Sequence, residues 1–199
     1  MPQKMILASS SPFRQQLMKN AGLSFSAFAA NVDERVVEAP LIQAGAEPQA
    51  IATALAEAKA LDVSARADQA LVIGSDQVLS LEGSIFHKCG DMAEARDRLI
   101  MMSGQTHFLD SAIAIARDEQ IVWRHVSRAT MHFRSFDETF VDHYLAMAGE
   151  GILSSVGAYQ FEGPGIQLFN AVEGDYFAII GLPLIPLLTQ LREMKAIPA

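Results

Sequence analysis

The chain has 199 residues, of which 50% are apolar and 19% are charged, so it can bury a core of its own and a disordered chain is excluded. Its formal net charge of −8 argues against binding a nucleic acid polymer through a general basic surface, although a nucleotide needs only a few local cations. The single cysteine, Cys89, excludes an internal disulfide and a multi-cysteine metal site.

Apolar patterns and capping residues predict strands that alternate with helices along the first third of the chain. Ser11 followed by Pro12 is a typical helix start, and Gly22 is a typical helix end. The elements expected here are strands at 4–8 and 23–30, helices at 12–20 and 48–65, and a linker at 39–48.

Three short β segments are predicted in the middle of the chain. The apolar run 71–73 is typical of a buried strand, and Asp76 follows where that run stops. Segments 78–81 and 84–87 are expected to form a hairpin that leads to Lys88. An acid at the end of one strand and a lysine at the end of its hairpin partner are expected to face one cleft.

The second half of the chain continues the mixture of strands and helices. The elements expected there are helices at 91–103, 137–148 and 184–194, and strands at 106–116, 120–133, 166–169 and 176–180. This order predicts an α/β fold with a mixed twisted sheet, flanking helices and two lobes around a central cleft.

The first candidate site is the strand–loop–helix over residues 8–14. Serine hydroxyls and the free N–H groups of a helix N-terminus make an anion site, and Arg14 adds a charged donor. The stretch lacks the glycines and the lysine of a Walker loop. Spacing alone favours the alternative, which is an ordinary capped helix with a surface arginine.

Acidic residues supply the second candidate site. Asp76 can bind Mg²⁺ or take a proton from water beside Lys88; the alternative is a turn aspartate and a solvated lysine. Asp33 and Glu34 are more typical of a solvated loop, but a metal–phosphate site needs more than one carboxylate. Lys59 lies on the apolar stripe of its helix, where it either extends outward to solvent, the slightly favoured alternative, or points at an anion.

Other polar residues have weaker signals. Glu162, in a glycine-rich turn, can accept two hydrogen bonds from a guanine edge or be an ordinary loop acid. The five histidines show no metal-ligand spacing, and His107 and His132 are expected to be structural. Cys89 is expected to be a spectator thiol.

Taken together, these residues resemble a known family over about residues 6–191. The quoted segments, in chain order, are Leu7-Ala8-Ser9-Ser10-Ser11-Pro12-Phe13-Arg14, Val32-Asp33-Glu34, Ala56-Glu57-Ala58-Lys59-Ala60, Gly74-Ser75-Asp76-Gln77, Lys88, Ser103-Gly104-Gln105-Thr106-His107, Gly157-Ala158-Tyr159 and Gly181-Leu182-Pro183-Leu184. Any one of them is weak, but the ordered set resembles the Maf-like nucleoside triphosphate pyrophosphatases, once named septum-formation inhibitors.

The resemblance implies hydrolysis between the α and β phosphates of a nucleoside triphosphate, with a divalent cation, Mg²⁺ or Mn²⁺. It implies Asp76 as the proton acceptor, with Lys88 and Glu34 as further catalytic residues. Asp76 and Glu34 would hold the metal. The phosphate-binding residues that it implies are Ser9 or Ser11, Arg14 and Lys59, together with Lys88.

Base selection in the family is linked to three positions that are Phe13, Gln77 and Glu162 here, and this combination resembles the 7-methyl-GTP branch. Phe13 can stack on a cationic methylated purine, and Glu162 can accept hydrogen bonds from the guanine edge. Cys89 stands where the family usually has proline, which removes a rigid turn after Lys88.

We therefore expect one domain over residues 1–199 that converts 7-methyl-GTP to 7-methyl-GMP and diphosphate. The alternatives are a dTTP, UTP or other modified-nucleotide pyrophosphatase, and a non-catalytic nucleotide-binding regulator of cell division. No secretory signal or membrane-length apolar run occurs, so a cytoplasmic protein without a membrane partner is expected. The expected partner is the nucleotide, not a nucleic acid polymer, and a homodimer is left open.

Overall fold

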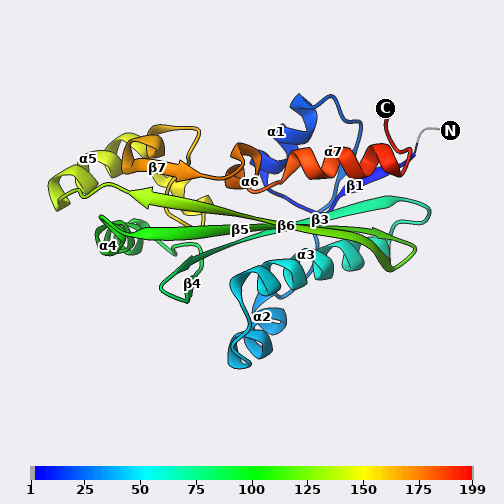
Figure 1. The fold of residues 1–199 in the computed structure, drawn as a ribbon, viewed down its shortest axis with the longest axis horizontal. Helices are drawn as coiled ribbons and strands as arrows, with labels where there is room; N and C mark the ends of the chain where they lie inside the picture. Colours follow the sequence, from blue (N-terminus) through cyan, green and yellow to red (C-terminus); the bar gives the residue numbers. More distant parts are fainter. Residues whose placement is uncertain (1–2, 199) are drawn as a thin grey trace.

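The computed structural model describes residues 3–198, which form a seven-stranded mixed sheet with helices on both faces (Figure 1). The strands lie in the order β2-β1-β3-β5-β6-β7, and β4 pairs with β3. The first two neighbour pairs are parallel, and all others are antiparallel. The strands are β1 (Met5–Leu7), β2 (Ser26–Ala27), β3 (Leu71–Leu81), β4 (Ser84–Phe86), β5 (Thr106–Arg117), β6 (Gln120–Phe133) and β7 (Phe169–Glu173). The predicted α/β fold with a mixed sheet is confirmed.

Different helices cover the two faces of the sheet. Figure 1 shows α2 and α3 on one side of the sheet and α1, α6 and α7 on the other. The helices are α1 (Pro12–Asn20), α2 (Glu34–Gln43), α3 (Pro48–Ser64), α4 (Met92–Met102), α5 (Glu138–Ala148), α6 (Tyr176–Ile180) and α7 (Leu184–Glu193), with the 3-10 helices η1 (Glu150–Ser154) and η2 (Pro164–Leu168). Within residues 3–198, no helix combines the length and the apolar character needed to cross a membrane.

The central strand β3 is unbroken, so the predictions that it stops before Asp76 and that a new strand begins at Val78 are wrong. Residues 74–76 stay paired with β5, which holds the backbone extended. Glycine is needed at position 74 because α3 packs directly on this strand: a Cβ there would lie 2.1 Å from the carbonyl oxygen of Ala56. This close contact brings the middle of α3 beside the middle of β3.

Helix α2 covers residues 39–43 of the linker predicted over 39–48, and the prediction is wrong there. Asp33 caps the helix by accepting hydrogen bonds from two backbone N–H groups of its first turn. Pro40 removes one backbone donor inside the helix. The helix forms nevertheless, because Val37 and Leu41 pack against the core beneath α3.

The predictions of strands at 166–169 and 176–180 are also wrong. The first range lies mostly in η2, and the second is α6. Asp175 caps the start of α6, and Gly181, with φ of 105°, ends the helix. The apolar run between them is too short for its periodicity to distinguish helix from strand, so the caps decide its conformation. The strand predicted at 23–30 shrinks to the two residues of β2.

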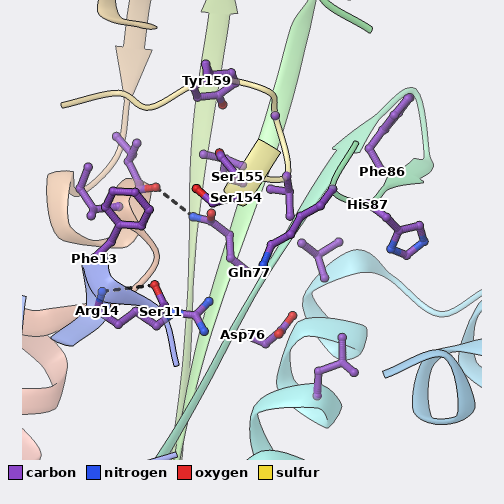
Figure 2. A pocket seen from close by; sticks show the side chains of 18 of the residues that line it. Ser11, Phe13, Arg14, Asp76, Gln77, Phe86, His87, Ser154, Ser155 and Tyr159 are labelled. Atoms are coloured by element: carbon purple, nitrogen blue, oxygen red, sulfur yellow. Dashed lines mark hydrogen bonds between the residues drawn. The ribbon is translucent and has the colours of Figure 1, made fainter. Parts of the chain in front are cut away.

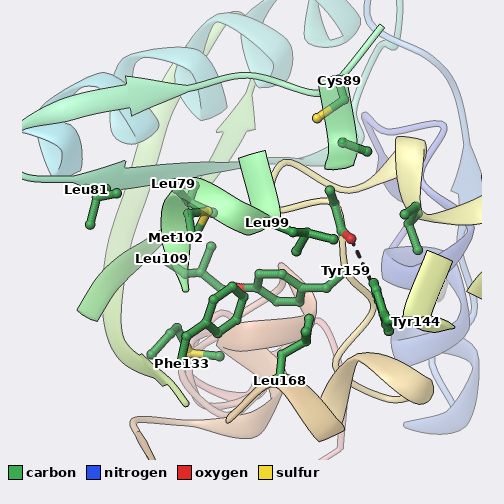
Figure 3. Close-up of a cluster of buried hydrophobic side chains, with 14 of the residues drawn as sticks. Leu79, Leu81, Cys89, Leu99, Met102, Leu109, Phe133, Tyr144, Tyr159 and Leu168 are labelled. Atoms are coloured by element: carbon green, nitrogen blue, oxygen red, sulfur yellow. Dashed lines mark hydrogen bonds between the residues drawn. The ribbon is translucent and has the colours of Figure 1, made fainter. Parts of the chain in front are cut away.

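The two faces of the sheet are packed with apolar side chains of different size. Ile73 and Ile115 pack against α1 and α7, where large side chains fill the space between sheet and helices. Ala112 and Ala114 face α3, where small side chains let the helix backbone approach the sheet. A third cluster fills the other end of the molecule, around Tyr159 and its neighbours (Figure 3).

Candidate active site

A cavity of about 300 Å³ opens at a gap along one edge of β3. β1 pairs with β3 only as far as Ile73, and β4 pairs with it only from Leu79 onward. Within the part of the chain that the structure describes, residues 74–78 pair on one side alone, with β5. Because side chains alternate along a strand, Asp76 and Gln77 leave β3 on opposite faces, and both line the cavity at this gap (Figure 2).

The cavity brings together nearly all of the residues that the sequence singled out. The predicted site residues that line it are Ser11, Phe13, Arg14, Glu34, Lys59, Asp76, Gln77, Lys88 and Glu162. Ser9 does not line it, but it is buried and bonded to two residues that do: its Oγ accepts hydrogen bonds from the Ser11 N–H and from Arg14.

Lys59 points into this cavity, so the favoured expectation that it extends outward to solvent is wrong. Its Nζ lies 2.5 Å from Asp76 Oδ1 and 2.6 Å from Glu34 Oε1. The Lys59 side chain is 13% exposed and that of Asp76 is 9% exposed. The contact of α3 with Gly74 sets this geometry, because it places the lysine opposite the aspartate two residues further along β3.

The two carboxylates that share Lys59 have pKa values shifted in opposite directions. Burial raises the pKa of Asp76 above its ordinary value, although the charges of Lys59 and Arg14 oppose the rise. Burial also acts to raise the pKa of Glu34, but the Lys59 hydrogen bond and the charges of Lys59, Lys88 and Arg14 bring that pKa below its ordinary value. The difference follows from exposure, since the Glu34 side chain is 53% exposed. Asp76 is therefore the better proton acceptor near neutral pH.

Arg14 is anchored inside the protein. The alternative, a capped helix with a surface arginine, is right about the cap and wrong about the arginine. Ser11 does cap α1, with its Oγ accepting from the Arg14 N–H. The Arg14 guanidinium donates to the carbonyl oxygens of Gly181 at 2.9 Å and Ser75 at 2.7 Å. Figure 2 shows it reaching from α1 toward the space beside Asp76. These bonds use Nε and Nη1, which leaves Nη2 to meet an anion in the cavity.

Lys88 lines the cavity from the wall formed by the β3–β4 hairpin. It follows β4 by two residues, and its side chain is exposed. Its charge acts on Glu34, which helps to lower the pKa of that carboxyl. Lys88 and Asp76 thus face one cleft as expected, although Asp76 lies in the middle of a strand.

The three residues linked to base selection line the same cavity but are held very differently. Gln77 Nε2 lies within 3.1 Å of Ser111 Oγ and of two carbonyl oxygens at the end of α6, so its amide is fixed. Within residues 3–198 the amide oxygen has no hydrogen-bond partner. Phe13 belongs to the first turn of α1, and Glu162 lies in an exposed turn. In Figure 2, Phe13 and Phe86 stand on opposite sides, with Gln77 between them.

Sequence reasoning missed a small charged cluster on the α2 wall. Glu38 is buried, and its Oε1 lies 2.8 Å from Arg35 Nη1 and 3.6 Å from His87 Nε2. All three side chains line the cavity. The signal that was available is the i, i+4 spacing of Glu34 and Glu38 after the Asp33 cap, which places both acids on one face of a helix.

The buried histidine and cysteine agree with the structural roles expected of them. His107 is fully buried, its Nε2 lies 2.8 Å from the Tyr159 hydroxyl, and burial lowers its pKa to about 3. Cys89 is buried in the core cluster of Figure 3, and burial raises its pKa. Neither side chain lines the cavity.

The acids of the cavity do not by themselves complete a metal site. Within residues 3–198, no group of three or more His, Cys, Asp or Glu side chains is placed to hold a metal ion. Asp76 and Glu34 both contact the Lys59 ammonium. Magnesium in nucleotide enzymes takes one or two carboxylates with phosphate oxygens and water, so this pair fits an ion that binds together with a nucleotide.

Comparison with known proteins places this cavity in context. Residues 4–194 match the family described as Maf-like protein. The chain is 57% identical over 194 residues to a protein of Brucella suis biovar 1 named 7-methyl-GTP pyrophosphatase, with 98% of each chain covered. It is 57% identical over 197 residues to a protein of the same name from Rhizobium johnstonii, with 99% of each covered. A protein of Granulibacter bethesdensis named nucleoside triphosphate pyrophosphatase is 44% identical, with 98% of each covered.

Proposed function

This chain belongs to the Maf-like protein family, and on that premise we propose that it is a nucleoside triphosphate pyrophosphatase that hydrolyses 7-methyl-GTP to 7-methyl-GMP and diphosphate. The relatives of that name at 57% identity support the activity. The observation that carries the proposal is the buried Asp76 carboxylate, which is bonded to Lys59 inside a cavity that also holds Arg14 and Lys88. A cluster of cations around one acid of raised pKa suits an anionic substrate attacked by water.

The reaction assigns a distinct task to each group. Water attacks the α phosphorus, the bond from that phosphorus to the oxygen bridging to the β phosphorus breaks, and diphosphate leaves. Asp76 takes the proton of the attacking water, and Lys59 keeps Asp76 ionised despite its burial. Arg14 and Lys88, which both line the cavity, hold the triphosphate, with the N–H groups and hydroxyl at the start of α1.

We propose a divalent cation, Mg²⁺ or Mn²⁺, as cofactor, held by Asp76 and Glu34 together with the phosphates. When bound, such an ion neutralises phosphate charge and withdraws electrons from the phosphorus. Glu34 is suited to this task because its pKa lies below the ordinary value and its side chain is 53% exposed. Lys59 already contacts both carboxylates, so the ion needs phosphate oxygens to complete its ligand set.

Base selection is proposed for Phe13, Gln77 and Glu162. A methylated guanine carries a positive charge, which an aromatic face attracts and a carboxylate offsets. Glu162 can accept hydrogen bonds from the N1–H and N2–H groups of guanine. The free oxygen of Gln77 adds an acceptor whose position is fixed by the bonds of its amide nitrogen.

The remaining expectations stay predictions. They are one domain over residues 1–199, a cytoplasmic location, and a nucleotide as partner with no nucleic acid polymer or membrane, with a homodimer as an open alternative to a monomer. The long strands β3, β5 and β6 support the single domain, because they run through both ends of the molecule (Figure 1).

The test is release of diphosphate from 7-methyl-GTP, GTP, dTTP and UTP, compared at equal enzyme and metal concentrations. We expect the highest kcat/KM for 7-methyl-GTP. A preference for dTTP or UTP would keep the chemistry and overturn the base assignment. If no nucleotide is hydrolysed and the Asp76→Asn variant binds nucleotide like the wild type, a nucleotide-binding regulator is the better description.

A further inference from the structure

Arg98, on α4, holds together two walls of the cavity without lining it. Its Nη1 donates hydrogen bonds to the carbonyl oxygen of His87, just before Lys88, and to that of Val156 at 3.0 Å. The first carbonyl belongs to the segment after β4, and the second belongs to the loop that follows η1. One guanidinium nitrogen therefore links two segments that are 69 residues apart in sequence, and His87 and Val156 both line the cavity.

The Arg98 guanidinium also contacts an acidic and an aromatic side chain. Nη2 lies 2.7 Å from Glu94 Oε1, and the guanidinium carbon lies 5.4 Å from the centre of the Phe86 ring. The Arg98 side chain is 9% exposed. A buried arginine bonded through both of its terminal nitrogens keeps a fixed position, because its planar fork loses little further freedom when each bond forms.

The same turn of α4 also holds the chain on the far side of Lys88. Glu94 Oε2 accepts a hydrogen bond of 2.8 Å from the Gly90 N–H, and the intervening Cys89 is buried in the core. The backbone is thus fixed immediately before and after Lys88, while the Lys88 side chain is exposed toward the cavity. A long flexible side chain that follows a three-residue strand needs such an anchor if its ammonium is to stay in one place.

We propose that Arg98 is a positioning residue, which sets the place of Lys88 and its distance from the loop at 154–157. This inference rests on the proposed function, since it assigns Lys88 to the binding of the triphosphate. The arginine acts through backbone carbonyls and does not touch the substrate. Its loss therefore affects catalysis through Lys88, and not as an independent contribution.

The first experiment measures kcat and KM for 7-methyl-GTP in Arg98→Met, which keeps the aliphatic bulk and removes the donors. Arg96→Met is the matched control, because Arg96 lies on the same helix and pairs with Glu138 and Asp142 on the surface. We expect kcat/KM to fall about 10- to 100-fold in Arg98→Met and to change less than about twofold in the control. Arg98→Lys keeps the positive charge but lacks the planar fork, so its kcat/KM is expected to lie between those of the wild type and Arg98→Met.

The second experiment repeats the change in a Lys88→Met background. If Arg98 acts through Lys88, Arg98→Met lowers kcat/KM there by less than about threefold. A full, multiplicative loss in that background overturns the proposal, because the arginine then contributes independently of Lys88.

The third measurement needs no substrate, so it separates this inference from the proposed function. Backbone amide exchange is measured over residues 86–90 and 154–158 in the nucleotide-free protein. We expect faster exchange in both segments in Arg98→Met, and in Glu94→Gln should the methionine variant fail to fold, with wild-type rates in Arg96→Met. Unchanged exchange in both segments overturns the positioning role, whether or not the wild type hydrolyses a nucleotide.

Discussion

The two ends of the cavity are built in different ways. At the end assigned to the phosphates, Asp76 and Lys59 sit in the middle of β3 and α3, buried and bonded to each other. At the end assigned to the base, Phe13 begins a helix and Glu162 lies in an exposed turn. Gln77, the third residue proposed for base selection, also lies on β3. We therefore expect the long, packed elements to fix the reacting groups, and the helix start at Phe13 and the exposed turn at Glu162 to tune the choice of base. Changes at the first end are expected to abolish turnover, and changes at the second to redirect it.

The largest effect is expected from Asp76→Asn. The amide cannot take the proton of water, so diphosphate release from 7-methyl-GTP should fall about 100- to 10,000-fold. Release is measured under saturating nucleotide, with circular dichroism to check the fold. Asp142→Asn serves as the control, since Asp142 is 58% exposed in a surface ion pair. Equal rates in Asp76→Asn and wild type would remove Asp76 from the reaction.

Gly74→Ala tests whether the packing of α3 on β3 builds the phosphate end. The new methyl group would lie 2.1 Å from the carbonyl oxygen of Ala56, so the helix must move or the protein must lose stability. We expect a loss of about 3 kcal/mol in the free energy of unfolding, measured in urea, with a fall in activity. Gly151→Ala is the control, because its methyl group would make only an ordinary contact at 3.6 Å. An unchanged midpoint in Gly74→Ala would show that this contact is not needed.

Glu162→Gln probes the base end. The change removes a negative charge and one acceptor for the guanine edge, so the ratio of kcat/KM for 7-methyl-GTP to that for UTP should fall about 5- to 100-fold. Inhibition by inorganic triphosphate, which reports on the phosphate end alone, should stay within about twofold. The control is Glu150→Gln, an exposed glutamate in η1. A loss of triphosphate inhibition equal to the loss of turnover would argue against two separate ends.

Phe13→Leu is expected to have the smallest effect. Leucine keeps an apolar side chain and removes the aromatic face, so only the attraction to a cationic ring is lost. The preference for 7-methyl-GTP over GTP, measured as a ratio of kcat/KM, should fall about 2- to 30-fold. Phe28→Leu, at an exposed phenylalanine, is the control. An unchanged preference would mean that the methyl group is recognised elsewhere.

Much of the site was predictable because its residues occur in ordered local segments. Ser11 and Pro12 started a helix as expected, and the motif around Asp76 lies at the cavity. The direction of the Lys59 side chain was predicted wrongly. A cation on an apolar stripe can extend to solvent or point at a buried anion, and only the element that packs against the helix decides between the two. The decisive feature is the contact at Gly74, which a helix pattern taken alone does not reveal.

The errors in secondary structure have related causes. Polar and small residues suggested a linker over 39–48, but tertiary packing against α3 stabilises a helix over the first half of that range. Residues 176–180 have strand-forming side chains, yet Asp175 and Gly181 cap them as a helix. The run through Asp76 was divided at Gly74, although pairing with β5 keeps the strand extended. In each case a long-range contact or a cap outweighed local propensity.

The most direct test of the central claim, that Lys59 keeps the buried Asp76 ionised as the base, is the pH dependence of kcat/KM in Lys59→Met. Burial raises the pKa of Asp76 and Lys59 opposes the rise, so removing the lysine raises that pKa further. The acidic limb of the profile, where activity appears as the base loses its proton, should therefore move to higher pH than in the wild type. Lys88→Met should lower the rate without moving the limb. A limb at the wild-type position in Lys59→Met, or one moved to lower pH, would contradict the account.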